Sequence, residues 1–439
     1  MLNLLTASID ARSPHGVAGG VARLIRGGEL APGARLPTVR ELAVALGTSP
    51  TTVSQAWALL SRAGLISPQG RRGTFVADLQ SPRSVWRVRR TMGSPGRPAL
   101  DLSTGTPDLA LLPDMAAAIA RVVPADNTRD YYDPPVIAEL EEELRRRWPY
   151  EPASITVVDG AMDALDRVVR ERVHLGSRVL VENPSYPPLL DLLELVGAEI
   201  ISLELDAEGV TPASLTAGLA HRPAAVFLQP RAQNPTGCSF SPARARELAR
   251  LLVGTDALIV EDDHSGDIAQ GPAMSLGAWL PDSTVHIQGF SKSYGPDLRL
   301  AAMGGPAPLI SSLVDRRLLG PGWSSRLLQQ VLLELLRDPA TQAVVTRARE
   351  TYTERRARLV ASLAGHGVCA GAADGINAWV PVADEQTVLL AMATKGVGVA
   401  AGSPFILDRL PSDHVRVTAG LLREDADRVA GLLAAAATG

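Results

Sequence analysis

The stretch GFSKSYGPDLR, residues 289–299, places a lysine in a polar turn bounded by glycines. Lysine occurs only at Lys292 and Lys395 among 43 basic residues, so arginine meets almost every need for positive charge. A primary amine can lose its proton and attack an aldehyde, whereas a guanidinium cannot. Hydroxyl groups flank Lys292 and Arg299 follows it, a pattern typical of a Schiff-base lysine beside a bound phosphate. The alternative is a surface lysine that escaped replacement, which is what we expect of Lys395.

Beyond about residue 100, short β-rich runs alternate with helical patterns such as 161–173 and 242–252. This alternation predicts an α/β domain with a mostly parallel sheet. From about residue 325, a long helix and then strands near 377–382 and 415–417 predict a smaller C-terminal α+β part. The strands that we predict for the sheet are 155–158, 179–181, 199–203, 225–228, 257–260, 285–287 and 300–303.

Polar motifs follow three of these predicted strands, where α/β folds bind ligands. They are Gln233-Asn234-Pro235-Thr236-Gly237, Glu261-Asp262-Asp263-His264 and the Lys292 segment; Arg416 lies further along, in residues 414–420. Asn234, Asp262, Lys292 and Arg416 occur in the order and approximate spacing found in fold-type I aminotransferases, which use pyridoxal 5′-phosphate. Over residues 100–437 the chain therefore resembles that family. Each motif alone is a weak signal, but four in order are highly specific.

The resemblance implies a role for each residue around the cofactor ring. Lys292 would be the catalytic residue and form the aldimine with the cofactor aldehyde. Asp262 would pair with the pyridine N–H, and Asn234 would donate to the phenolate oxygen. Tyr186 matches the aromatic residue that stacks on the ring. Arg416 would bind the α-carboxylate of an amino-acid substrate or effector.

The resemblance also implies a phosphate site. Ser291 and Arg299 would hold the phosphate together with the backbone N–H groups of Gly160 and Ala161, at a helix N-terminus. Tyr131 matches a residue that reaches the phosphate across a dimer interface, so we expect a homodimer.

Three positions depart from the family pattern. His264 stands where tyrosine usually hydrogen-bonds the phenolate oxygen; histidine can make that bond, or it can be an ordinary polar residue. Gly289 replaces a common phosphate-binding serine or threonine. Asp159 precedes the phosphate loop, where its carboxylate would repel phosphate unless it points away. We therefore expect weakened cofactor binding.

The first quarter of the chain is basic although the whole is slightly acidic. Residues 1–98 hold thirteen arginines and four acidic residues, so they carry about +9, and the remainder carries about −13, for a net charge of −4. A basic module on an acidic body predicts a polyanionic partner for the module alone.

Capping signals in this module predict two short helices. Thr38 and Glu41 form a capping box, and Gly47 ends the first helix. After a tight turn, Ser49 caps a second helix that starts with Pro50. Two short helices joined by a glycine turn, the second beginning with small polar residues, predict a helix-turn-helix.

Short runs at 65–66 and 74–76 predict a hairpin, or wing, with Arg71 and Arg72 at its tip. With this wing, residues 17–78 resemble the winged helix-turn-helix of GntR-type bacterial regulators. Six motifs carry the resemblance: Gly28-Glu29-Leu30, Pro32-Gly33, Leu36-Pro37, Arg40-Glu41-Leu42-Ala43, Gly64-Leu65-Ile66 and Gly73-Thr74-Phe75-Val76.

The GntR resemblance implies contacts with double-stranded operator DNA. A winged helix used only for protein contacts is the alternative, and the arginine excess argues against it. The implied contacts are Arg35 and Arg40 with phosphates or a base edge, Ser49, Thr51, Thr52 and Gln55 with the major groove, and Arg71 and Arg72 with the backbone or minor groove.

The combination resembles the MocR subfamily of bacterial transcriptional regulators across nearly the whole chain. We divide it into a winged helix-turn-helix at 12–78, a linker at 79–100 and an aminotransferase-like, pyridoxal-phosphate-binding domain at 101–437. In that subfamily the large domain serves as a sensor of the cofactor, sometimes with an amino-acid-like effector. The alternative is an active aminotransferase with an accessory DNA-binding domain; turnover of an amino-acid/oxo-acid pair would favour it.

Composition limits the setting in which the protein works. No apolar run is long enough for a membrane span, and we see no signal peptide. Cys238 and Cys369 lack zinc-binding spacing, so we expect no metal site and two buried free thiols in a reducing cytoplasm.

Overall fold

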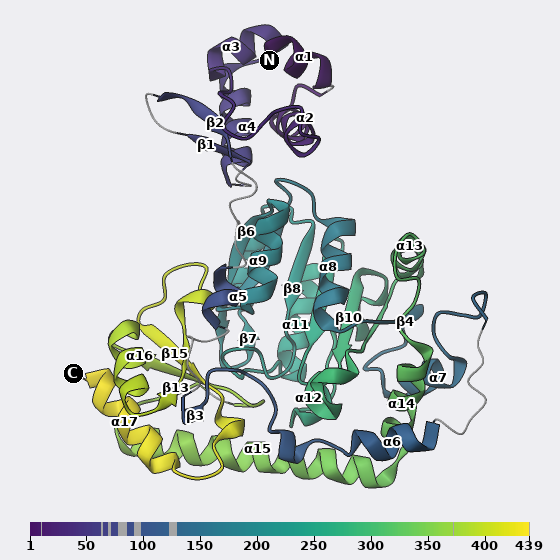
Figure 1. Ribbon diagram of the computed structural model, residues 1–439, viewed down its shortest axis with the longest axis vertical. Coiled ribbons are helices and arrows are strands. Elements are labelled where there is room, and N and C mark those ends of the chain that lie inside the picture. The colour runs from purple at the N-terminus through teal and green to yellow at the C-terminus, as the bar shows by residue number, and fades with distance from the viewer. Residues whose placement is uncertain are drawn as a thin grey trace.

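The computed structural model describes residues 1–9, 11–62, 65–68, 72–77, 86–91, 98–122, 130–371 and 373–438. Figure 1 shows a small N-terminal head above a larger body that contains the main sheet. Within the described residues, no helix is both long and apolar enough to cross a membrane. Cys238 is a buried free thiol, as expected, but the expectation is wrong for Cys369, whose thiol is free and exposed.

Within its described residues, the head contains four helices and a two-stranded hairpin. The capping box predicted for α3 is present, because the Glu41 backbone N–H donates to Thr38 and the Glu41 carboxylate accepts from the Thr38 backbone. Gly47 ends this helix in the left-handed conformation, with φ of 62°, and the Ser49 hydroxyl accepts from the Thr52 backbone N–H at 3.1 Å. The elements are α1 (Leu2–Ser8), α2 (Pro14–Arg26), α3 (Val39–Leu46), α4 (Pro50–Arg62), β1 (Ile66–Pro68) and β2 (Thr74–Val76).

An apolar core of its own holds the head together. Leu42, Val53 and Leu60 are fully buried in it, and Trp57 is nearly so. β1 and β2 pair antiparallel, as predicted for the wing. The helix-turn-helix and its hairpin are therefore one packed unit.

The body is built on an eight-stranded, mostly parallel sheet in the order β4-β11-β10-β9-β8-β5-β6-β7. Strands β10, β9, β8, β5 and β6 run parallel, and β11 and β7 pair antiparallel with their neighbours. This confirms the predicted fold class. The bounds are β4 (Ser154–Val158), β5 (Arg178–Asn183), β6 (Glu199–Asp206), β7 (Gly209–Val210), β8 (Ala225–Leu228), β9 (Leu258–Asp263), β10 (Thr284–Gly289) and β11 (Ala301–Gly305).

Helices cover the sheet because its strands are apolar on both faces. Residues in the inner strands β8, β9 and β10 are all buried, and two separate apolar clusters pack on the sheet with the helices. The body helices up to residue 317 are α6 (Met115–Val122), α7 (Ala138–Arg147), α8 (Ala161–Arg172), α9 (Pro187–Val196), α10 (Pro212–Leu219), α11 (Pro242–Leu252), α12 (Ser291–Tyr294) and α13 (Ala307–Arg317).

The C-terminal part has a small antiparallel sheet in the order β12-β15-β14, packed with helices (Figure 1). The single long helix expected from about residue 325 is wrong: Pro339 starts a second helix, and the Asp338 carboxylate caps it. The elements are α14 (Arg326–Arg337), α15 (Pro339–Gly365), β12 (Ala378–Val382), α16 (Glu385–Thr394), β13 (Val397–Gly398), β14 (Ala400–Ala401), β15 (Asp413–Val417) and α17 (Ala426–Thr438).

The segment expected to be an irregular linker contains a helix, α5 (Trp86–Thr91), and a strand, β3 (Leu100–Asp101). Arg87 is buried and forms a salt bridge with Glu194, and the Val88 backbone N–H donates to Asp191 of α9 at 3.0 Å. β3 pairs parallel with β13. Both elements are therefore anchored on the body.

Candidate ligand site and DNA-binding surface

The ends of neighbouring strands bring the predicted site residues together. β9 carries Asp262, α12 carries Lys292 directly after β10, and Asn234 lies in the loop after β8. These three strands are adjacent and parallel, so their carboxyl ends meet at one edge of the sheet. β15 of the small sheet adds Arg416, whose Nη1 lies 3.4 Å from Asn234 Oδ1.

Lys292 lies in an environment that favours its neutral amine. Burial lowers the pKa of Lys292 from 10.5 to about 8; the Asp262 carboxylate opposes this shift, and the Arg416 guanidinium adds to it. A useful fraction of the amine is therefore unprotonated near neutral pH, and the unprotonated amine is the form that attacks a carbonyl.

Asp262 presents one carboxylate oxygen without a partner. Its side chain is buried, and Oδ2 accepts a hydrogen bond of 2.8 Å from Gln229 Nε2. Oδ1 is buried and accepts no hydrogen bond in the part of the chain that the structure describes. Burial raises the pKa of Asp262 to about 6, although the Gln229 hydrogen bond lowers it. Such an oxygen is suited to a charged N–H donor from a ligand.

Arg416 is a buried guanidinium whose pKa burial lowers to about 10. It donates to the Ser103 carbonyl oxygen at 2.5 Å and lies over the Phe405 ring, 5.0 Å from its centroid. An added Cβ on Gly105 would lie 2.9 Å from Nη1, so only glycine allows this close approach. Among the described residues no carboxylate forms a salt bridge with Arg416, which leaves its charge for a ligand carboxylate.

A candidate phosphate cradle lies at the N-terminus of α8. Gly160 precedes the helix with φ of 105°, a conformation that favours glycine, and Ala161 is its first residue. A Cβ on Gly160 would lie 3.4 Å from Arg299 Nη2, so that guanidinium lies over the helix start. Ser291, half-buried, is the first residue of α12. A helix N-terminus with an arginine over it attracts phosphate.

The structure shows the surroundings of two of the three positions that depart from the family pattern, Asp159 and Gly289. The Asp159 carboxylate forms a salt bridge with Arg317, whose Nη2 lies 3.2 Å from Oδ2, so its charge is compensated. A Cβ on Gly289 would come no closer than 3.6 Å to His264 Cα, so no crowding requires glycine there.

His264, the third departure, has a pKa well below its ordinary value. Burial, its largest cause, holds the pKa of His264 well below 6.5, and the nearby Lys292 charge acts in the same direction. Its Nδ1 is buried with no partner among the described residues, while Nε2 lies 3.3 Å from the Ser265 hydroxyl. A neutral imidazole has one N–H to donate.

The two tyrosines predicted for the site differ in setting. Tyr186 is the N-cap of α9, and burial raises its pKa to about 12. Tyr131 is 83% exposed and packs edge-to-face on Trp323, with ring centroids 5.5 Å apart. Its role at a partner's phosphate stays a prediction.

Sequence reasoning missed residues that support the site. Gln229 contacts Asp262, and Arg317 holds Asp159; neither stands in a recognisable motif. Glu182 is fully buried, and burial raises its pKa to about 8. The one signal for Gln229 was its place directly after a predicted strand, where polar residues gather.

Among the described residues, the predicted DNA contacts lie before and in α3, at and near the start of α4, and in the wing. Arg40, Thr51 and Gln55 are exposed, whereas the Ser49 and Thr52 hydroxyls lie 2.8 Å apart and serve the cap of α4. Arg35 is exposed and lies against Gly73 of the wing; a Cβ there would be 2.9 Å from its Nε. Arg72 is exposed, and Arg71 lies outside the described residues.

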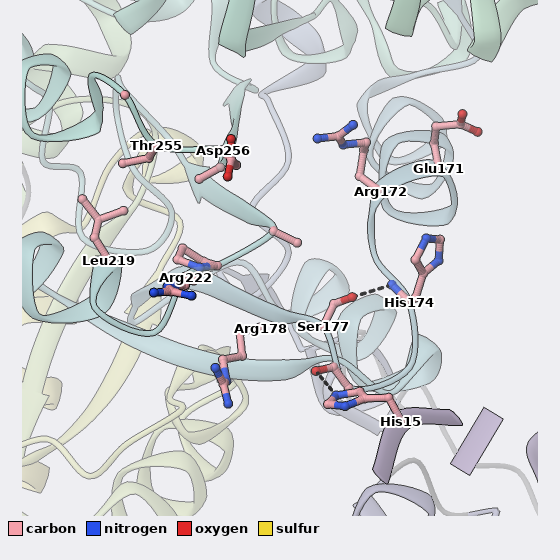
Figure 2. A pocket seen from close by; sticks show the side chains of 15 residues that line it. His15, Glu171, Arg172, His174, Ser177, Arg178, Leu219, Arg222, Thr255 and Asp256 are labelled. Carbon is pink, nitrogen blue, oxygen red and sulfur yellow. Dashed lines mark hydrogen bonds between the residues drawn. The ribbon is translucent and has the colours of Figure 1, made fainter. Parts of the chain in front are cut away.

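The head contacts the body at the turn between α8 and β5. His15 Nε2 lies 3.2 Å from the Gly176 carbonyl oxygen (Figure 2). Leu175 packs on the apolar core of the head. A cavity of about 770 Å³ lies beside this contact, lined by His15 and by body residues such as Arg172 and Arg222. The head therefore meets the body next to an open cleft.

Comparisons with known proteins agree with this architecture. The family "Aminotransferase class I and II" matches residues 97–433, and "Bacterial regulatory proteins, gntR family" matches residues 15–76. Among solved structures, the α-aminoadipate aminotransferase LysN of Thermus thermophilus shares the fold of the body, with a TM-score of 0.70 and 22% identity over 80% of this chain and 97% of its own. These findings define a helix-turn-helix regulator with an aminotransferase class I and II domain.

Two transcriptional regulators are similar to this chain over most of its length. The vitamin B6 salvage pathway transcriptional repressor PtsJ of Salmonella typhimurium is 32% identical over 422 residues, 95% of this chain and 96% of its own. The HTH-type pyridoxine biosynthesis transcriptional regulator PdxR of Corynebacterium glutamicum is 30% identical over 347 residues, 76% of this chain and 75% of its own. The chain belongs to the MocR-type GntR transcriptional regulators, as predicted, and its body is of a class that typically binds pyridoxal phosphate.

Proposed function

We propose that this regulator binds pyridoxal 5′-phosphate at Lys292 and that cofactor binding changes the affinity of the head for its operator. The observation that carries the proposal is Asp262 Oδ1, a buried carboxylate oxygen without a partner among the described residues, beside a lysine of lowered pKa. A pyridine N–H would satisfy that oxygen and remove the cost of an unpaired buried group.

The other residues fit the rest of the cofactor. Asn234 accepts from Arg416 at Oδ1, so its amide nitrogen is turned the other way and can donate to the phenolate oxygen. Arg299 and the start of α8 would hold the phosphate. When bound, the cofactor supplies an aldehyde that reacts with a lysine amine and a protonated ring that withdraws electrons.

We propose that the ligand sensed by this chain is the phosphorylated aldehyde form of vitamin B6. The names of PtsJ and PdxR, a vitamin B6 salvage repressor and a pyridoxine biosynthesis regulator, support this choice. We further propose a cytoplasmic homodimer on paired operator half-sites, with Tyr131 at the partner's phosphate. The exposed position of Tyr131 is compatible with that role.

Helix α8 offers a route from the ligand to the head. Its first residues form the phosphate cradle, and the turn after its last residue carries Leu175 and Gly176, which contact the head. A helix moves as a rigid element, so a shift at the cradle displaces the docking turn. The route requires that the ligand bind one disposition of the head better than the other.

Two measurements test the proposal. Titration with pyridoxal phosphate should give visible absorbance that borohydride fixes on Lys292, located by peptide mapping. Operator affinity, measured at one salt concentration, should then differ between the ligand-free and loaded protein by about 5- to 150-fold. The proposal would be refuted by a protein that stays colourless with pyridoxal phosphate, or by an operator affinity that is the same with and without the cofactor.

An active aminotransferase is the second candidate, and Arg416 is the observation that favours it. Its buried charge has no carboxylate partner in the described part of the chain, as expected for a site that takes an amino acid. Repeated turnover of an amino-acid/oxo-acid pair by the full chain would support the enzyme. A single half-reaction without turnover would support an amino-acid-like effector.

A further inference from the structure

Gln229 lies between the end of β8 and Asp262 of the neighbouring strand β9. It follows β8 directly, is 6% exposed, and its backbone N–H donates to Glu182 Oε1 at 3.1 Å. Glu182 is itself 1% exposed, so the backbone of Gln229 is anchored inside the body.

The side chain of Gln229 bridges two residues of the ligand site. Its Nε2 donates to Asp262 Oδ2 at 2.8 Å, and its Oε1 accepts from the Asn234 backbone N–H at 2.8 Å. A backbone N–H can only donate, so it fixes which end of the amide is oxygen. The –NH₂ group must therefore face the carboxylate, whatever the protonation state of the site.

This bridge decides which oxygen of Asp262 remains for a ligand. Oδ2 is engaged by Gln229, and Oδ1 is left buried without a partner among the described residues. The same amide accepts from the backbone N–H of Asn234, a second residue of the candidate site. One glutamine thus sets the position of a carboxylate on β9 and of an amide in the loop after β8.

We propose that Gln229 is a positioning residue that aims Asp262 Oδ1 at the ring nitrogen of pyridoxal phosphate and keeps this carboxylate ionised. The inference rests on the proposed function. The charge-assisted bond from Gln229 stabilises the ionised carboxylate, and an ionised carboxylate is what holds the ring nitrogen protonated. Without the bridge, both oxygens would compete for that contact and the carboxyl group would tend to stay neutral in its buried setting.

Gln229→Met in the full-length protein tests the role, because it keeps the volume and removes both side-chain hydrogen bonds. Two probes are titrated: pyridoxal phosphate, and its carbocyclic analogue in which C–H replaces the ring nitrogen. Wild type should prefer pyridoxal phosphate, whereas Gln229→Met should lose roughly 10- to 100-fold in affinity for it. The affinity of the variant for the analogue should fall much less, because the analogue makes no bond to Asp262 and shares with pyridoxal phosphate only the contact with Asn234.

Gln288→Met is the matched control. Gln288 is also a buried glutamine at a strand end, but it pairs in register with Asp263, on the face opposite Asp262. This control should bind both probes like wild type. A loss of equal size for both probes in Gln229→Met would show a merely structural role and overturn the inference, as would no loss at all.

Gln229→Glu keeps the test open if the methionine variant fails to fold. Its new carboxyl group is isosteric and can donate to Asp262 only when protonated, so the affinity for pyridoxal phosphate should fall as pH rises while wild type changes less. Parallel pH profiles would overturn the inference. If wild type binds pyridoxal phosphate and both variants match it, the inference alone fails; if wild type binds none, the proposed function fails as well.

Discussion

The head and the body bury different kinds of side chain. Among the described residues of the head, every buried side chain is apolar, and its polar groups lie in caps or on the surface. The body buries polar and charged groups, including Glu182, Asp262 and Arg416, and some of their atoms have no partner in the described residues. Buried polar groups without partners cost stability, so the body is built to gain from a ligand and the head is not.

This difference separates the sources of stability in the two regions. Apolar packing and caps stabilise the head, whether or not anything is bound to the body. The body should be stabilised by the ligand that satisfies its buried groups, because a molecule that binds only the folded state shifts the folding equilibrium. Four substitutions test or sharpen this contrast.

Lys292→Ala should have the largest effect, because it removes the visible absorbance, the stabilisation by the ligand and the operator response together. At a hundred times the dissociation constant, pyridoxal phosphate should raise the free energy of unfolding of wild type by about 2.7 kcal/mol. The alanine variant lacks the amine and should lose most of that gain, the visible absorbance and the response of operator binding. Thermal unfolding with and without the cofactor measures the gain in stability. Lys395→Ala, at the chain's other lysine, is the control and should behave like wild type.

Asp262→Asn should change how stability depends on pH. The folded protein keeps a proton on Asp262 up to about pH 6, because burial raises its pKa from 3.8. The folded state therefore binds more protons than the unfolded chain between about pH 4 and 6, and the free energy of unfolding falls as pH rises through that window. The loss is up to about 3 kcal/mol in ligand-free wild type.

The asparagine variant carries no titrating group at this position, so it should lack this part of the pH dependence. Chemical denaturation at several pH values measures the difference between the two proteins. Saturating pyridoxal phosphate should abolish the loss in wild type, because the ring N–H compensates the charge. Parallel stability curves for the two ligand-free proteins would contradict the prediction.

Leu175→Ser addresses the contact between the two regions. Leu175 packs on the core of the head from the turn after α8, so a serine should weaken docking without touching the ligand site. The cofactor affinity should stay unchanged, while the response of operator affinity to the cofactor should shrink by about fivefold or more. Leu195→Ser, on an exposed leucine of α9, is the control and should leave that response intact.

Much of this architecture could be predicted from local patterns. The caps at Thr38 and Ser49 lie within three residues of the groups that they bind, so helices α3 and α4 of the head were predicted correctly. The strands were likewise predicted from runs of neighbouring residues, and the four site motifs were recognised from their order along the chain. The break at Pro339 was missed although proline signals it, because the apolar pattern continues on both sides.

Support between distant segments could not be predicted. Arg317 compensates Asp159 from 158 residues away, so the sequence showed a carboxylate beside a phosphate loop and no partner for it. Gln229 reaches Asp262 across 33 residues, from the end of β8 to the adjacent strand β9. Such contacts depend on which strands are adjacent and on the direction of each side chain, and neither is set by spacing along the chain.

Gly289→Ser should have the smallest effect, and it should be a gain. The sequence places glycine where the family often has a phosphate-binding hydroxyl, and the structure leaves room, since an added Cβ would lie 3.6 Å from His264 Cα and 3.8 Å from Ala161 Cβ. A new hydroxyl at the phosphate should tighten pyridoxal phosphate binding by about 1 kcal/mol, roughly fivefold. Absorbance titration measures the dissociation constant.

Replacing glycine also reduces the freedom of the unfolded chain, which would stabilise the protein with or without ligand. Gly365→Ser separates the two contributions, because a Cβ at Gly365 meets no atom within 4 Å and the residue lies at the end of α15, away from the ligand-bearing strand ends. This control should raise ligand-free stability without changing the cofactor's dissociation constant. If Gly289→Ser bound the cofactor no more tightly than wild type, the phosphate would not lie beside residue 289, and the cradle at α8 would have to hold it alone.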